Sequence, residues 1–400
     1  MAVPAGDRAA EDSRRLTAAL FAAGIATFGE LYAVQAVLPA LAAEWQLTES
    51  TASLAISVAT GALAVSVLPW AAIADRIGRA RAMTISAVIA AVAGALAPLA
   101  PSFPVLLALR GVAGLALGAV PALAMAHLVA KAPAGRVSAI GGLYIAGTTI
   151  GGLLGRVLTG AVSGFAGWRW GMATTAVLVA LAVAVFIVLL PHDVPRVAAG
   201  GLRTGHPATQ RGRIRLAMSD RYVWVFYLQA FLLMGGFVTV YNLLAFRLLD
   251  DPFRLPASLV SLLFLTYLVG TIGSSGVGRL VGRFGRRTVL AAAGYGMAVG
   301  VALTLAAALW LILAGLVILT FCFFVAHAIA STWAGQRVPA ARSQASALYS
   351  LAYYAGSSLL GFAGAVIFDR AGWAGAMLGV ILAVALAATI AVIGAPRSTR

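Results

Sequence analysis

The chain of 400 residues is poor in charge and has almost no cysteine. Charged residues make up 10% of it, whereas ordinary soluble domains carry about 25%. The single cysteine, Cys322, lies in an apolar run, so the chain cannot form an internal disulfide and has no paired-cysteine metal or redox motif. This composition argues against a soluble domain and against a disulfide-stapled scaffold.

Long apolar segments take the place of the missing charge. Hydrophobic residues make up 62% of the chain, and the mean hydropathy is +0.98. Apolar runs of about 18 residues or more, the length that crosses a bilayer as a helix, recur along the whole sequence. Repeated spanning with this pattern requires helices, because each backbone polar group must be paired within the segment. We therefore predict an all-α membrane protein.

We predict twelve transmembrane helices separated by short polar or Pro/Gly breaks. Their ranges are 16–41, 51–73, 82–100, 104–127, 137–160, 168–190, 221–246, 257–280, 288–307, 309–333, 344–367 and 373–395. The longest break is rich in Pro, Gly and Arg, and we expect a flexible basic linker there. The predicted domains are an N-terminal tail (1–15), a six-helix bundle (16–190), the linker (191–220), a second six-helix bundle (221–395) and a C-terminal tail (396–400).

Lysine and arginine indicate the orientation. With the N-terminus placed inside, 22 of the 28 basic residues fall in inside segments and four in outside loops, while Arg110 and Arg156 lie within spans. Cytoplasmic segments of membrane proteins carry such an excess. The pattern predicts that the linker and both termini are cytoplasmic. It also accounts for the net charge of +16 without a nucleic-acid partner.

The two halves of the chain repeat. Tyr144–Gly155 reads YIAGTTIGGLLG and Tyr353–Gly364 reads YYAGSSLLGFAG, at an offset of 209 residues, and Arg76–Arg79 is answered by Arg283–Arg286 at an offset of 207. Two matches at nearly one offset predict a duplicated, pseudo-symmetric six-helix unit, with a substrate site between the copies near the membrane midplane. The glycines expected at helix contacts are Gly147, Gly151, Gly152, Gly356 and Gly361, although ordinary packing explains each of them equally well.

One acidic residue lies deep inside an apolar run. Glu30 follows Leu16 by about 14 residues, or about 21 Å of helix, which places it near the middle of a bilayer. An ionisable group there is by default a functional candidate. Arg110 also lies within a span, and Glu30 is the only acid at a similar depth that could partner it. The alternatives are a protonated Glu30 that bonds to a neighbouring helix and an Arg110 that bonds only to carbonyls and water.

The loop after the second span carries a signature. Ala71–Arg81 resembles the G-x-L-x-D-R-x-G-R-R loop of the major facilitator superfamily, with Ala71 in place of the first glycine. A second copy, Gly278–Arg287, has Gly282 where the first has Asp75. We expect Asp75 to hold one conformation shut and Gly78 to make a tight turn; a plain positively charged loop is the alternative. The gating candidates are Asp75, Arg76, Gly78, Arg79, Gly278, Arg283, Gly285 and Arg286.

Three further segments resemble the efflux branch of that superfamily. Arg110–Gly114 resembles the superfamily's R-x-x-x-G motif, whose arginine is linked to proton transfer in the efflux branch, and Gly147–Gly152 is similar to the antiporter signature G-P-x-x-G-G with Thr148 for proline. In the first span, Glu30, Gln35 and Leu38-Pro39 follow the Asp…Asn…Leu-Pro pattern of drug/proton exporters. Closer similarity to the acriflavine-sensitivity, arabinose-efflux-like bacterial branch lies in Phe231–Leu248 and Gln344–Ser358.

The resemblance implies a twelve-span drug/proton antiporter, which exports a small lipophilic or weakly polar molecule by alternating access. A proton-coupled uptake permease and a non-transporting membrane sensor are the alternatives. The residues expected to line the cavity, each also explicable as packing, are Tyr32, Gln35, Gln229, Tyr241, Asn242, Tyr353 and Tyr354.

The same resemblance sets the expected partners. We expect no enzymatic activity, no metal and no cofactor, with the proton gradient as the energy source. The expected partners are the lipid bilayer, protons and a small-molecule substrate. We expect a monomer that crosses the bacterial cytoplasmic (inner) membrane many times.

Overall fold

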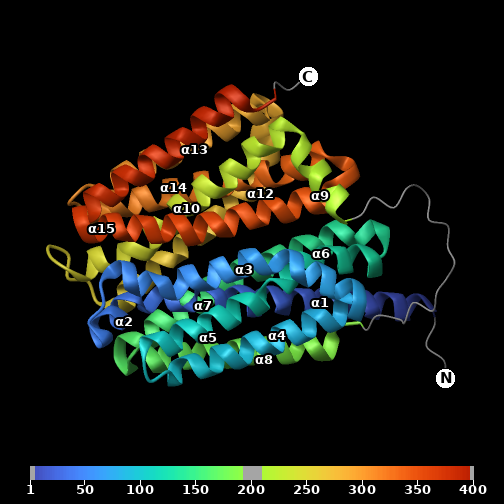
Figure 1. Cartoon of the computed structure of the whole chain (residues 1–400), viewed down its shortest axis with the longest axis horizontal. Coiled ribbons are helices and arrows are strands. Elements are labelled where there is room, and N and C mark those ends of the chain that lie inside the picture. Colours follow the sequence, from blue (N-terminus) through green and yellow to red (C-terminus); the bar gives the residue numbers. More distant parts are fainter. Residues whose placement is uncertain (1–4, 192–209, 397–400) are drawn as a thin grey trace.

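The computed structural model describes residues 5–191 and 210–396, and every regular element in these ranges is helical. The helices lie side by side along one direction (Figure 1). The first half comprises α1 (Ala5–Tyr32), α2 (Leu38–Trp45), α3 (Glu49–Ile77), α4 (Arg79–Leu96), α5 (Phe103–Leu117), α6 (Ala119–Lys131), α7 (Val137–Ala166) and α8 (Trp168–Leu189). The second comprises α9 (Gln210–Ser219), α10 (Arg221–Leu249), α11 (Ala257–Ser261), α12 (Tyr267–Phe284), α13 (Arg286–Leu303), α14 (Leu309–Arg337) and α15 (Arg342–Gly394).

Twelve membrane crossings follow from these helices. Within the described ranges, ten helical stretches are long and apolar enough to cross a bilayer. One of them includes α15, which leaves helical geometry at Gly372 and turns back there, so it crosses twice. The twelfth crossing is α13, whose 18 residues rise about 27 Å. It is not among the ten because the two arginines at its start make the helix less apolar as a whole.

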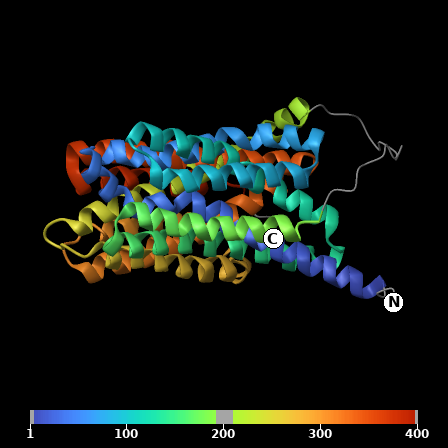
Figure 2. The same ribbon diagram turned by 90° about the horizontal axis from the view of Figure 1, so that it is seen from below.

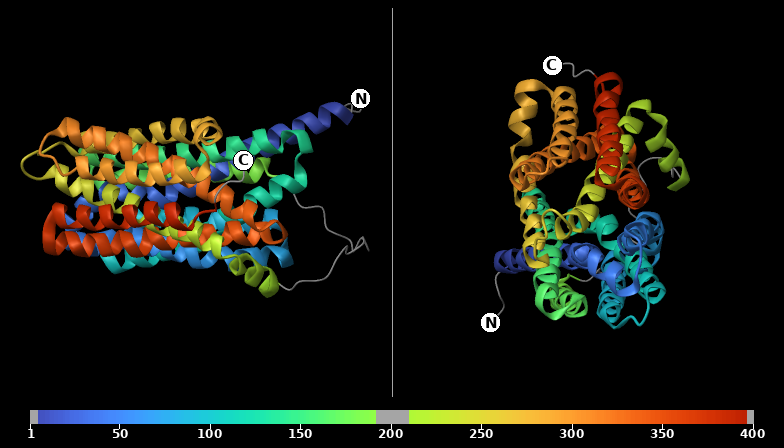
Figure 3. Two further views of the ribbon diagram at one scale, coloured as in Figure 1. Left: turned by 90° about the horizontal axis from the view of Figure 1, so that it is seen from above. Right: turned by 90° about the vertical axis from the view of Figure 1, so that its left-hand side faces the viewer.

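The crossings form two bundles of six. In Figure 1 the helices α1–α8 make the lower bundle and α9–α15 the upper one. The end-on view in Figure 3 separates the same two groups, and Figure 2 shows the bundle from below. Large apolar side chains such as Leu99, Leu181 and Ile393 are exposed on the outside, as expected where a surface faces lipid.

Glycines in left-handed conformations make the tightest turns at both ends. Gly78 joins α3 to α4 with φ of 92°, and Gly285 joins α12 to α13 with φ of 80°. Gly167 and Gly372 make the equivalent turns at the opposite end, with φ of 89° and 64°. A side chain at any of these positions would be strained, because residues with a Cβ rarely adopt positive φ. The tight turn predicted at Gly78 is present.

The same helix contact occurs once in each bundle. A Cβ added to Gly147 of α7 would overlap the backbone of Phe21 in α1, and one added to Gly356 of α15 would overlap the backbone of Phe231 in α10. Small residues allow backbones in a membrane to approach this closely. The repeated glycine motif therefore makes the same contact in both bundles. Its two partners, Phe21 in the first crossing and Phe231 in the seventh, are 210 residues apart.

The described chain begins and ends toward the same end of the molecule, on the right in Figure 1. We call this the terminal end and the opposite one the distal end. Residues 5–15, expected as a tail, belong to α1 and continue into the first span. Of the predicted linker, residues 192–209 lie outside the described residues, whereas Gln210–Ser219 form the short helix α9. Most of the predicted C-terminal tail also lies outside them.

The two bundles meet toward the distal end. There the backbone N–H of Ser50 donates to Asp369 at 3.1 Å, and Ser358 donates to the carbonyl of Ser57 at 2.7 Å. Nearby, Gly160 of α7 packs against Ser261 of α11. Each of these contacts joins the first bundle to the second, so in this conformation the distal end is closed.

Candidate functional site

A break in the first span positions the site. After α1 ends at Tyr32, the chain tightens into a 3₁₀ turn over Ala33–Val37 before α2 begins. Pro39 accounts for this, because proline has no N–H to donate and its ring clashes with the carbonyl four residues earlier. The last carbonyls of α1 are consequently left without partners in their own helix.

Arg110 of α5 occupies the free end of α1. Its Nη1 lies 2.8 Å from Oε1 of Glu30 and 3.0 Å from the Glu30 carbonyl, and its Nη2 lies 2.5 Å from the carbonyl of Leu31. Its Nε donates to the carbonyl of Ala55 in α3 at 3.2 Å. The guanidinium thus ties three crossings together. The negative end of the α1 dipole also favours a cation there.

Glu30 is enclosed inside the first bundle. Its exposed fraction is 3%, and that of Arg110 is 0%. The carboxyl lies against Gly94 of α4, where a Cβ would overlap it. The structure therefore brings together the two charged residues singled out from the sequence. A proton on Glu30 would remove the charge from the pair, yet Arg110 would keep its three carbonyl partners.

A second buried arginine lies between the bundles. Arg156 of α7 donates from Nε to Oε1 of Gln35 at 2.6 Å and from Nη1 to the carbonyl of Gly152 at 2.7 Å. Its guanidinium carbon lies 4.1 Å from the ring centre of Tyr32 and 4.6 Å from that of Tyr267. Arg156 was expected within a span, but the sequence alone gave it no role. The signal was available, because a charge at that depth is itself a functional candidate.

Gln35 carries the network from one bundle to the other. Its Nε2 donates to Oδ1 of Asn242 in α10 at 2.6 Å, while its Oε1 accepts from Arg156. Both amides are fully buried. Three polar side chains from three crossings are thus joined across the interface, and two of them, Gln35 and Asn242, were predicted to line the cavity.

Of the other predicted cavity residues, three tyrosines join a cluster of aromatic and hydroxyl side chains, and Gln229 lies apart from it. The hydroxyl of Tyr241 bonds to Thr266 and Thr320 at 2.6 and 2.7 Å, beside the ring of Tyr267. Tyr353 and Tyr354 lie edge to face at 5.1 Å, with Tyr353 against His327. Gln229, in contrast, does not join this group, because its Nε2 donates to the carbonyl of Ala387 inside the second bundle at 2.5 Å.

The predicted gating loops lie at the terminal end. Asp75 and Arg76 are exposed, and within the described chain Asp75 makes no hydrogen bond or ion pair. Arg79 donates to the carbonyl of Ala126 at 3.0 Å, and Arg286 donates to Gln336 at 2.7 Å. Arg283 lies over the ring of Phe284, and a Cβ on Gly278 would meet open space. Each loop thus contacts its own bundle in this conformation.

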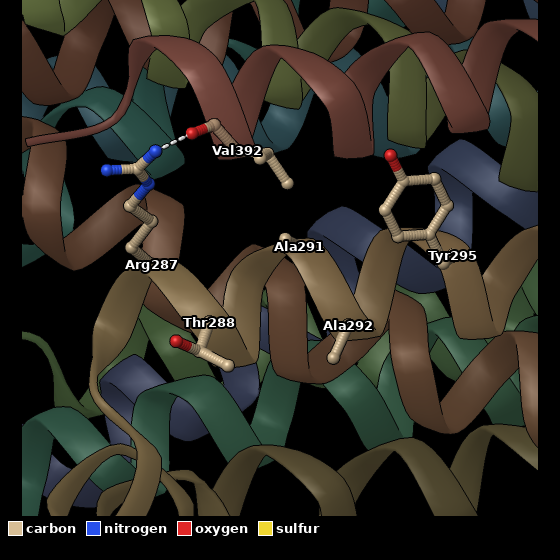
Figure 4. Close-up of a pocket in the computed structure, with 6 residues that line it drawn as sticks. All are labelled: Arg287, Thr288, Ala291, Ala292, Tyr295 and Val392. Carbon is tan, nitrogen blue, oxygen red and sulfur yellow. Dashed lines mark hydrogen bonds between the residues drawn. The ribbon is translucent and has the colours of Figure 1, made fainter.

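A groove on the outer surface lies away from this network. It runs between α13 and the last part of α15, lined by Arg287, Thr288, Ala291, Ala292, Tyr295 and Val392 (Figure 4). Arg287 donates across it to the carbonyl of Val392. No residue of the groove touches Glu30, Arg156 or their partners, so it does not belong to the candidate site.

Comparisons with known proteins match this architecture. The family model described as Major Facilitator Superfamily matches residues 20–281. The uncharacterized MFS-type transporter YybF of Bacillus subtilis is 35% identical over 93% of this chain and 92% of its own. The inner membrane transport protein YnfM of Escherichia coli is 36% identical over 93% and 89%. The crystal structure of the nucleoside transporter NupG superposes with a TM-score of 0.70 at 15% identity, covering 94% of this chain and 97% of that one.

Proposed function

Because the chain belongs to the major facilitator superfamily of membrane transporters, we propose that it is a secondary active exporter that exchanges protons for a small molecule. The observation that carries the proposal is the ion pair between Glu30 and Arg110, 2.8 Å apart and almost completely buried. Buried ionisable groups in membrane proteins mark proton and ion pathways.

The pair has two states that differ by one proton. When Glu30 is ionised, its carboxylate binds Nη1 of Arg110 and links α1 to α5. When Glu30 carries a proton, that charge-assisted bond weakens, whereas the bonds from Arg110 to the carbonyls of Glu30, Leu31 and Ala55 persist. The proton therefore changes how the first crossing is held without expelling the arginine.

Alternating access supplies the transport step. The distal end is closed by contacts between the bundles, and Asp75 at the terminal end has no partner in the described chain. The excess of basic residues favours a cytoplasmic terminal end, so the closed distal end would face outward and Asp75 would bind its partner in the opposite conformation. The proposed location is a bacterial inner membrane, with both termini in the cytoplasm and the protein acting as a monomer.

The proton gradient is the proposed energy source, and no cofactor is involved. Each proton that moves inward releases about 2.3 kcal/mol per 100 mV of membrane potential, in addition to the contribution of the pH difference. This is a useful driving force for uphill export.

Membrane vesicles of both orientations test this function. A panel of lipophilic cations, antibiotics, sugars and organic acids is offered to inverted vesicles, whose interior is acidified by respiration. We expect at least one solute to accumulate inside, to depend on this chain and to be lost when an uncoupler is added. Accumulation in right-side-out vesicles alone would identify proton-coupled uptake and contradict export.

A further inference from the structure

Arg156 lies between the bundles, almost completely buried and surrounded by aromatic rings. We propose that this arginine binds the carboxylate of an organic anion and that the aromatic side chains around it contact the apolar body of that anion. The inference names the substrate class of the transporter and so rests on the function proposed above. It narrows the lipophilic or weakly polar solute expected from the sequence to an acid.

Arg156 carries a buried charge. Only 2% of its surface is exposed. Within the described ranges it makes no ion pair, and its hydrogen bonds go to the amide of Gln35 and the carbonyl of Gly152. A buried charge is stable only when it is paired or well bonded. Arg110 has the carboxylate of Glu30, whereas Arg156 has neutral partners, so a bound anion would supply the missing charge.

Aromatic rings surround the guanidinium of Arg156. Its carbon lies 4.1, 4.6 and 5.3 Å from the ring centres of Tyr32, Tyr267 and Phe264. Ring faces attract the cation and hold it in place. They also offer an apolar wall of the kind that binding sites for small organic molecules use. The site therefore suits an anion with an aromatic or similarly apolar body.

Two buried polar atoms lack partners on side chains next to Arg156 and its partner Gln35. The hydroxyl of Tyr32 and Nδ2 of Asn242 are buried without a hydrogen-bond partner. The amide Nδ2 is a donor only, and the hydroxyl can donate. A carboxylate accepts and does not donate, so it matches these two donors and the guanidinium together.

The site lies where alternating access would expose it. Tyr32 and Arg156 belong to the first bundle, whereas Asn242, Phe264 and Tyr267 belong to the second. Substrate sites of transporters built from repeats lie at this kind of interface. Separation of the bundles would break the bond between Gln35 and Asn242 and open the space between them.

A negative substrate has an electrical consequence. When one proton enters and one monoanion leaves, two elementary charges cross the membrane in the same sense. When a proton and a monoanion enter together, no net charge crosses. The direction of coupling can therefore be measured as a current once an anion is found to bind.

Matched pairs of small probes test the site. Benzoate and phenylacetate are compared with their uncharged amides, benzamide and phenylacetamide, in a thermal-stability titration of the purified full-length chain in detergent. A ligand that binds the folded state raises the melting temperature. We expect the acids to bind about 10- to 100-fold more tightly than the amides, because each forms a charged hydrogen bond with Arg156.

Three variants connect this preference to Arg156. In Arg156→Gln the preference for acids should disappear, and in Arg156→Lys it should be partly retained because the charge remains. In Gln35→Glu a carboxylate replaces the amide that now accepts from Nε, so the acids should be excluded while the melting temperature of the free protein holds or rises. The control is Arg254→Gln at an exposed distal position, which should leave the preference unchanged.

The outcomes separate this inference from the proposed function, because binding is measured without any gradient. If no acid binds, if acids and amides bind equally, or if Gln35→Glu binds acids as the parent does, the anion site is refuted, whatever the vesicles show. If acids bind through Arg156 but no gradient drives them across a membrane, the anion site stands and proton-coupled export is refuted.

Discussion

The two bundles share their packing but differ in buried charge. In each, a glycine of the motif near Tyr144 or Tyr353 packs against a phenylalanine backbone in the first crossing of that bundle. By the offsets of the repeat, however, Glu30 corresponds to Val240 and Arg156 to Ala365. The duplicated scaffold has therefore kept its helix contacts, while the buried glutamate and arginines of the described residues, Glu30, Arg110 and Arg156, all lie in the first bundle.

The second bundle is rich in aromatic contacts instead. Phe237 stacks on Phe323 with ring centres 4.1 Å apart and packs edge-on against Tyr267 at 5.4 Å. Tyr241 packs against Tyr267 at 5.1 Å. Such pairs form a wall with few ways to rearrange. Among the described residues, the first bundle therefore carries the buried charges and the second provides a wall of aromatic rings.

The largest expected effect comes from Arg110→Gln, which removes the ion pair with Glu30 inside the first bundle. Removal of one partner leaves the Glu30 carboxylate buried and unpaired, so we expect the free energy of unfolding to fall by about 3–5 kcal/mol. We also expect transport to be lost. Thermal unfolding of the purified protein measures the loss of stability. The double variant Glu30→Gln/Arg110→Gln should recover much of it, and equal stability of the single and double variants would show that the two charges do not interact.

Leucine at the matched glycines tests what the bundles share. Gly147→Leu and Gly356→Leu should each force their helices apart, at a cost of about 1–3 kcal/mol or more, and transport should fall strongly in both. Gly276→Leu is the control, because a Cβ there meets open space. Normal transport in either variant would show that the two contacts are not equivalent in function.

Much of the scaffold was predictable because its signals are local. Apolar runs, basic loops and the repeated glycine motif predicted twelve crossings in two bundles, and the pairing of Glu30 with Arg110 followed from both being charges at similar depth. The break at Ala33–Val37 was not predicted, although Pro39 indicates it in retrospect. The position of Gln229 could not be predicted, because most residues of α10 are buried and its sequence pattern does not show which neighbouring helix a given side chain faces.

Arg156 shows the other limit of the sequence. Its depth was visible, but its role depends on Gln35, Asn242 and Tyr267, which lie on three other crossings and come together only in the folded chain. Spacing along the sequence contains no information about such an assembly.

A smaller effect is expected from Gly94→Ala, which removes no charged group but displaces the carboxyl of Glu30. A Cβ at this position would overlap the carboxyl of Glu30, so the carboxyl must shift relative to Arg110. We expect gradient-driven transport to fall several-fold with little change in expression. Gly142→Ala, where a Cβ has nothing nearby, is the control, and equal transport rates for the two variants would argue against a close dependence on this geometry.

The smallest effect is expected at the terminal end, where the repeated loops differ by one acid. Asp75→Asn should slow transport by a few-fold without changing substrate affinity, because it would remove the bond that we propose Asp75 makes only when that end is closed. Gly282→Ala in the second loop should have no effect. Unchanged transport rates for Asp75→Asn would mean that the loop serves only to orient the chain in the membrane.

Glu30→Gln tests most directly whether Glu30 couples the proton gradient to substrate movement, as we propose. The amide keeps the shape and can still hydrogen-bond, but it cannot bind and release a proton at physiological pH. The measurement is substrate movement in proteoliposomes with and without an imposed pH gradient. We expect the variant to retain exchange of labelled for unlabelled substrate and to lose all dependence on the gradient. Accumulation that still follows the pH gradient in Glu30→Gln would contradict the account.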